Sequence, residues 1–181
     1  MSSITQSIDV AVPVRVAYDQ WTQFESFPQF MEGVDEVRQL DDTHLHWVAD
    51  VGGNTEEWDA EITEQEPDMR IAWTSTTGAR NAGVVTFHRL SDEQTRVTLQ
   101  MEWEPQGILQ QAGDKLGFDE RRVKGDLERF KDFIEERGTA TGAWRGRVEG
   151  GSSSGGGTGG TTQGGWTGSS DLGGSTGGSG R

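Results

Sequence analysis

The chain has 181 residues, and its 30 acidic and 16 basic side chains give a formal net charge of −14. Because phosphate groups repel so acidic a chain, the composition disfavours nucleic acids and anionic lipid surfaces as partners. The sequence contains no cysteine, which excludes disulfides, thiolate nucleophiles and zinc–thiolate sites.

The hydrophobic pattern contains no membrane or export signal. No apolar run approaches the ~18 residues of a membrane-spanning helix, and the polar start MSSITQSIDV differs from a signal peptide. We therefore expect no integral membrane association, a cytoplasmic location, and a monomer or weak dimer.

The composition changes sharply toward the C-terminus. From Gly150 onward the chain is a Gly/Ser/Thr tract, which buries too little area to offset the entropy of ordering it. The sequence therefore predicts one domain over residues 1–138 and a disordered Gly/Ser/Thr-rich tail over residues 139–181.

The first elements are a strand and two short aromatic helices. Ile4, Ile8 and Val10 alternate with polar residues and indicate a strand that ends before a proline. The apolar residues from 14 to 24 follow helical spacing, and a second helical turn carries Phe27, Phe30 and Met31. Pro28 predicts a bend between the two helices, which would then share one aromatic face.

The middle of the chain alternates with a period of two. Runs within residues 34–51, 58–75 and 83–103 are separated by short turns, which favours an antiparallel meander with one apolar and one wet face. The apolar parity collects large side chains, namely Trp47, Trp58, Trp73, Phe87, Met101 and Trp103.

The last strongly patterned element is a long helix that runs from about residue 108 to about residue 137. It is the only element long and apolar enough to cover the apolar face of the sheet. Large aromatic side chains pack poorly between a curved sheet and one helix, so we expect a cavity there. In the alternative, the tryptophans fill a solid core.

Four segments carry a family resemblance. They are SIDVAVPVRVAYDQWTQFESFPQFM at residues 7–31, WDAEI at 58–62, GVVTFH at 83–88 and GDLERFK at 125–131. They resemble the polyketide cyclase/dehydrase branch of the START-like SRPBCC superfamily, which also contains the coenzyme Q-binding START domains. The resemblance covers about residues 4–137. It implies an α+β helix-grip fold, in which a curved seven-stranded antiparallel sheet wraps around a long C-terminal helix and leaves a hydrophobic tunnel.

Catalytic and metal signatures are weak. The strand carboxylates Glu57, Asp59 and Glu61 share the wet parity, as do the histidines at 44 and 46, so we expect no catalytic residue, metal site or cofactor. Gly125 interrupts the long helix and predicts either close packing on an aromatic ring or room for a ligand.

The sequence therefore predicts binding, and possibly transport, of a hydrophobic small molecule such as a lipid, quinone or polyketide. One alternative is a polyketide cyclase or dehydratase that uses the same cavity, and another is a protein-interaction role that depends on the tail. The residues expected to contact the ligand are Trp47, Trp58, Trp73, Phe87, Met101, Trp103 and Leu116, with Arg122 at the mouth.

Overall fold

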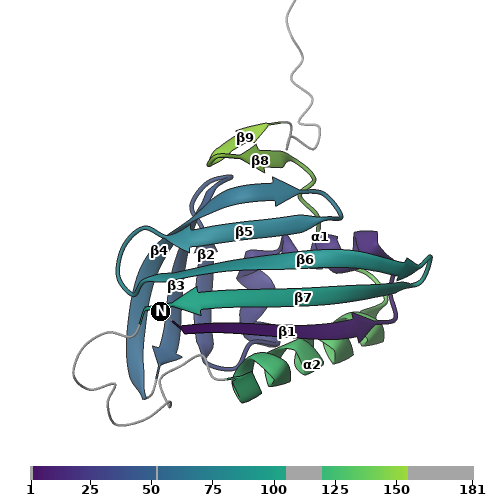
Figure 1. Ribbon diagram of the computed structural model, residues 1–181, viewed down its shortest axis with the longest axis horizontal. Helices are drawn as coiled ribbons and strands as arrows, with labels where there is room; N and C mark the ends of the chain where they lie inside the picture. The colour runs from purple at the N-terminus through teal and green to yellow at the C-terminus, as the bar shows by residue number, and fades with distance from the viewer. Residues whose placement is uncertain (1, 52, 105–119, 155–181) are drawn as a thin grey trace, which may run out of the picture.

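The computed structural model describes residues 2–51, 53–104 and 120–154 (Figure 1). The main sheet is formed by the strands β1 (Ser2–Val10), β2 (Val34–Gln39), β3 (His44–Val51), β4 (Asn54–Glu66), β5 (Arg70–Ser75), β6 (Asn81–Ser91) and β7 (Gln94–Trp103). Between β1 and β2 lie the helix α1 (Val14–Trp21) and the 3₁₀ helix η1 (Phe24–Gln29). After β7 come the helix α2 (Glu120–Arg137) and the short strands β8 (Arg147–Glu149) and β9 (Ser152–Ser154).

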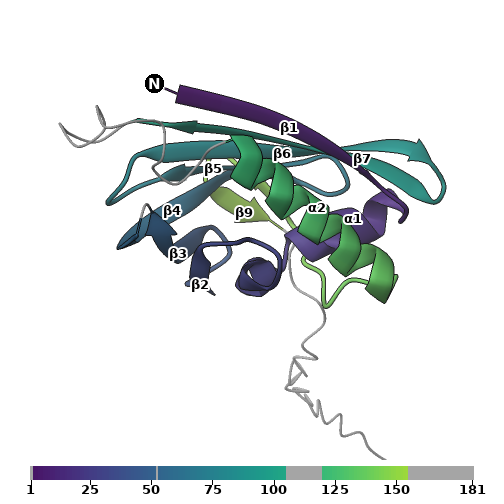
Figure 2. The same cartoon turned by 90° about the horizontal axis from the view of Figure 1, so that it is seen from below.

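The main sheet is an antiparallel meander that the first strand completes. Strands β2 to β7 lie in sequence order, and β1 pairs with β7 from Ser2 opposite Trp103 to Val10 opposite Thr95. The helix α2 crosses one face of this sheet (Figure 2). These observations confirm the predicted α+β class and the long C-terminal helix as the cover of the sheet. The part of that helix expected over residues 108–119 lies outside the described residues.

The predicted seven-stranded path is confirmed, but two further strands extend it, so the sheet contains nine among the described residues. The strand β4 is bulged between Ile62 and Glu64, and its last residues pair with β8, where Gln65 lies opposite Val148. Val148 is completely buried. Within β8, Val148 is buried and its two neighbours are polar and exposed. A single apolar residue is too short a pattern for hydrophobic periodicity to reveal a strand.

The two predicted short helices are present, but the bend lies earlier than Pro28. The helix α1 ends at Trp21, and the Thr22 hydroxyl donates a hydrogen bond to the Asp19 carbonyl at 2.5 Å. Gln23 then leaves helical geometry with φ −94° and ψ 70°, while Pro28 lies inside η1. The side-chain hydrogen bond of Thr22 competes with continuation of the helix, so the chain bends at Gln23 and not at Pro28.

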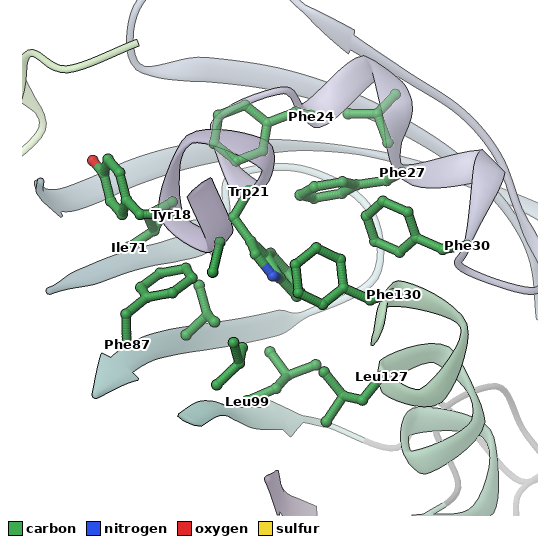
Figure 3. Close-up of a cluster of buried hydrophobic side chains, with 14 of the residues drawn as sticks. Tyr18, Trp21, Phe24, Phe27, Phe30, Ile71, Phe87, Leu99, Leu127 and Phe130 are labelled. Carbon is green, nitrogen blue, oxygen red and sulfur yellow. The ribbon is translucent and has the colours of Figure 1, made fainter. Parts of the chain in front are cut away.

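The aromatic side chains of these helices form a solid core against α2 (Figure 3). Trp21 lies among them, with its ring centroid 5.2 Å from that of Phe27 and 5.4 Å from that of Phe130. Phe30 reaches Phe130 at 5.2 Å. Edge-to-face and tilted pairs of this kind add to the stability that area burial supplies. At this end of the sheet, the alternative of a solid core is the correct one.

The folded chain continues past the expected boundary at residue 138. Gly138, with φ +69°, ends α2, and its N–H donates to the Ile134 carbonyl at 2.8 Å. Residues 139–154, here called the return segment, then pass back over α1, where the N–H of Thr141 donates to Gln20 Oε1 at 2.9 Å and the N–H of Trp144 donates to Thr22 Oγ1 at 3.0 Å. The return segment therefore belongs to the fold, and the expected tail beyond Ser154 lies outside the described residues.

Neither helix of the described chain is long and apolar enough to cross a membrane.

Candidate ligand-binding cavity

A cavity of about 50 Å³ lies between the sheet and α2. Its apolar lining comes from α1, from η1 and the loop after it, from the strands β2 to β5 and β7, and from α2. It consists of Trp21, Phe27, Met31, Val34, Trp47, Ala49, Val51, Trp58, Trp73, Leu99, Met101, Val123 and Leu127. Four polar residues, Glu32, Asn81, Arg122 and Asp126, complete it. The space admits only a few water molecules. The expected unfilled volume is present, but in this structure it is small.

Two stacked indoles form one wall of the cavity. Trp47 in β3 and Trp58 in β4 lie directly opposite each other in the strand register. Their rings are 5.8 Å apart and nearly parallel, with an interplanar angle of 6°. Both side chains are buried, because the period of two turns them to the covered face of the sheet while their neighbours face outward.

A third indole depends on a glycine. Trp73 in β5 lies opposite Gly83 in β6, and a Cβ atom on Gly83 would lie 2.2 Å from Trp73 Cζ2. The absence of a side chain at residue 83 therefore allows the indole to lie across the neighbouring strand. Trp73 is only half-buried, so its ring forms part of the wall near the surface.

The structure brings five of the expected ligand-contacting residues to the cavity, namely Trp47, Trp58, Trp73, Met101 and Arg122. Phe87 and Trp103 do not line it. Phe87 packs edge-on against Tyr18 at 5.4 Å, because α1 covers that part of β6, and Trp103 ends β7 beside a polar surface depression. Leu116 lies outside the described residues.

Arg122 closes the rim of the cavity. Its Nε and one terminal nitrogen donate to the Glu32 carbonyl at 2.9 and 2.7 Å, and that terminal nitrogen also reaches the Asp50 carbonyl at 3.2 Å. The guanidinium group lies against Gly33, where a Cβ atom would be 1.5 Å from it. Arg122 thus ties the first described turn of α2 to the loop after η1 and to the end of β3.

Asp126 is a polar lining residue that the sequence analysis missed. Its Oδ1 accepts hydrogen bonds from the Glu32 N–H at 2.9 Å and from Arg129. Burial raises the pKa of Asp126 above its ordinary value of 3.8, although these two hydrogen bonds act in the opposite direction. Residues 122, 123, 126 and 127 share one face of a helix. The positions of Arg122, Val123 and Leu127 in the sequence are therefore sufficient to place Asp126 on the same face.

The outward polar residues stay away from the cavity. His46 Nδ1 lies 2.7 Å from Asp59 Oδ1 and donates a hydrogen bond to it when that nitrogen carries a proton, and His44 Nδ1 lies 2.9 Å from Asp41 Oδ1. Within residues 2–51, 53–104 and 120–154, no group of three metal-ligating side chains is close enough to hold an ion.

Gly125 borders a surface groove rather than an aromatic ring. A Cβ atom there would lie 3.2 Å from a terminal nitrogen of Arg129. The expected packing on a tryptophan or phenylalanine is therefore wrong, because residue 125 lies on the α2 face beside Arg121 and Arg129.

The sequence and the fold identify a family. Residues 10–132 match the family described as polyketide cyclase/dehydrase and lipid transport, and the chain belongs to this family. Its fold is the START-like helix-grip fold.

Three known proteins illustrate the similarity. The chain is 60% identical over 149 residues to an uncharacterized 17.2 kDa protein in the melC2-rnhH intergenic region of Streptomyces lincolnensis, and the match covers 82% of this chain and 99% of that protein. The crystal structure of DR_A0006 from Deinococcus radiodurans matches with a TM-score of 0.62 and 25% identity, over 76% of this chain and 99% of that one. A START superfamily protein from Mycobacterium smegmatis matches in fold, with a TM-score of 0.57 and 12% identity over 75% and 95% of the two chains.

Proposed function

We propose that the protein binds an apolar or amphipathic small molecule in the cavity between the sheet and α2. The observation that carries the proposal is the lining itself, in which four indoles and two methionines meet the apolar face of α2. Removal of apolar surface from water would supply the affinity. At ~25 cal/mol per Å², a ligand that buries about 250 Å² gains about 6 kcal/mol before the costs of association.

Binding must enlarge the cavity. Benzene binds in dry apolar cavities of about 150 Å³, several times the volume that is open here. The half-buried lining residues Trp73, Met31 and Met101 are the natural ones to move, since they are less enclosed than the rest of the lining and methionine has several low-energy rotamers. The proposal therefore includes a structural change that widens the space on binding.

The experiment is a titration of the full chain with a panel of quinones, fatty acids and aromatic hydrocarbons. We expect the intrinsic tryptophan fluorescence to change with at least one class, and native mass spectrometry of protein purified from its own host to detect a co-purified small molecule. The absence of both signals would contradict binding.

A cavity-filling variant provides the specific control. Ala49 is buried and lines the cavity, so Ala49→Leu should abolish binding while every indole stays in place. Ala82→Leu adds the same atoms to β6 outside the lining and should leave binding intact. Circular dichroism of both variants shows whether they fold. Equal binding by a folded Ala49→Leu variant would place the ligand elsewhere.

Asp126 supports a second candidate, a cyclase or dehydratase. A carboxyl group whose pKa burial raises can act as a general acid or base on a substrate in the cavity. In this case, a poly-β-ketone thioester should be converted by the native protein, and Asp126→Asn should reduce turnover by about 10²-fold or more at unchanged substrate affinity. Equal turnover by the two proteins would remove Asp126 from any such mechanism.

A further inference from the structure

Two indoles of the cavity wall carry buried N–H groups that have no hydrogen-bond acceptor. Nε1 of Trp47 and Nε1 of Trp58 are without a partner among the residues that the structure describes. Their side chains are only 7% and 4% exposed, so bulk water does not replace the missing acceptor. A buried indole N–H normally finds a partner, and an exception requires an explanation.

Packing alone does not explain these two residues. Phenylalanine would provide a stacking aromatic ring at both positions without burying an N–H donor, which costs free energy when it stays unpaired. The two residues are cross-strand partners with stacked rings, so both indoles belong to one wall of the cavity. Most of the other buried polar atoms without a hydrogen bond belong to Tyr18, Gln65, Asp68 and Arg70, none of which lines the cavity.

Trp21 is a different case. Its Nε1 also lacks an acceptor and its ring also lines the cavity. Its ring, however, is enclosed edge-on by Phe27 and Phe130, so the indole is part of the solid aromatic core (Figure 3). We therefore assign no ligand contact to Trp21.

We propose that Trp47 and Trp58 are specificity-determining donors, which bind acceptor oxygens at the buried end of the ligand through their Nε1–H groups. This inference rests on the proposed function and specifies the chemistry of its ligand. The ligand carries carbonyl or equivalent acceptor oxygens on the part that enters the cavity, and a plain hydrocarbon of the same shape binds more weakly.

The proposal and desolvation alone predict opposite orders of affinity for two ligands that have the same shape but differ in acceptor oxygens. Naphthalene and 1,4-naphthoquinone have the same ring frame, but the hydrocarbon presents more apolar surface, so burial alone makes naphthalene the tighter ligand. A hydrogen bond of ordinary net strength changes affinity by about fivefold. We therefore expect the full chain to bind 1,4-naphthoquinone at least about fivefold more tightly than naphthalene in isothermal titration calorimetry.

Single variants identify the donors. Trp47→Phe and Trp58→Phe keep an aromatic ring and remove the N–H, and each should lower the naphthoquinone-to-naphthalene affinity ratio by about fivefold. Trp144→Phe is the matched control, because Trp144 is a half-buried tryptophan that does not line the cavity and its Nε1 is not one of the buried unpaired donors, so this variant should keep the ratio. A ratio that both test variants leave unchanged would overturn the inference.

The two proposals fail in different ways. Tighter binding of naphthalene by the native chain overturns the donor role and leaves hydrophobic binding intact, whereas binding of neither probe contradicts the proposed function itself.

A second readout avoids variants that fail to fold. In ¹H–¹⁵N spectra of the native chain, naphthoquinone should shift the indole signals of Trp47 and Trp58 downfield, and naphthalene should not. Equal shifts with both probes would also overturn the donor role.

Discussion

Gly83 determines how the indole of Trp73 lies in the cavity wall. Gly83→Ala would place a Cβ atom 2.2 Å from Trp73 Cζ2, and the displaced ring should cost about 1–3 kcal/mol of unfolding free energy. Urea denaturation measures this loss. Trp73→Leu removes the clash, so the double variant should lose less stability than the sum of the two single variants. Additive losses would show that the two residues do not interact.

Asp126 should make stability depend on pH in an unusual direction for a carboxylate. Because burial raises its pKa in the folded state, the folded chain binds more protons than the unfolded chain between pH 3.8 and that raised value. The contribution of this carboxyl group is therefore fully present below pH 3.8 and is lost as pH rises through the raised pKa.

The comparison with Asp126→Asn isolates this effect, since the amide oxygen can still accept from Glu32 and Arg129. Relative to the variant, the native protein should become less stable as pH rises from 3.8 through the raised pKa of Asp126, as measured by chemical denaturation at each pH. A constant difference between the two proteins would mean that the pKa of Asp126 is not raised.

At the scale of single residues, sequence patterns located the apolar wall better than its polar part. Strand parity places Trp47, Trp58, Trp73 and Met101 on the covered face, where they line the cavity, because a period of two fixes the face of each side chain. Parity could not separate the cavity from the solid core, since Phe87 has the same parity and packs on Tyr18 from another element. That distinction depends on three-dimensional packing between segments distant in sequence.

Among the elements, the return segment is held by an arginine between two carboxylates. Arg145 lies 2.6 Å from Asp19 Oδ1 and 2.8 Å from Asp68 Oδ2, and its guanidinium carbon is 5.5 Å from the ring centroid of Tyr18. Asp19 is only 8% exposed, and burial raises its pKa despite the arginine. Loss of this cation would leave the buried Asp19 carboxylate with only the more distant and more exposed Arg15, 3.7 Å away, as its counter-charge.

Arg145→Met should therefore lower the free energy of unfolding by about 2 kcal/mol. Arg147→Met is the control, because the Arg147 pair with Glu66 at 3.1 Å is more exposed and should contribute less than about 1 kcal/mol. Thermal denaturation of both variants checks the difference.

A chain that ends at Gly138 should lose more stability than one that ends at Ser154, and equal stability of the two would mean that the return segment contributes nothing.

The return segment also shows why composition alone does not locate the end of the folded chain. The sequence around residues 139–149 contains few apolar residues, and composition alone therefore favours a tail. Its attachment relies on backbone hydrogen bonds to Gln20 and Thr22, on Arg145 and on the buried Val148. Such contacts have no periodicity, whereas the long strands and α2 have a strong one and were predicted correctly.

For the whole molecule, the excess of negative charge should weaken the folded state at low ionic strength. A net charge of −14 is distributed over a compact fold, where like charges are closer together than in the unfolded chain. Raising the salt concentration from about 0.01 M to about 0.15 M shortens the screening length from about 30 Å to about 8 Å. We expect the Tm to rise over this range in differential scanning calorimetry. A fall would mean that surface ion pairs outweigh the repulsion.

The nearly closed cavity has a consequence for the speed of ligand uptake. A chamber of about 50 Å³ cannot admit a ring system until Arg122 and the residues around it move apart. If opening precedes entry, the observed association rate should level off at high ligand concentration, where it equals the rate of opening. Stopped-flow traces would then report the rate at which the ligand-free protein opens, and every ligand that uses this entrance would reach the same maximum association rate.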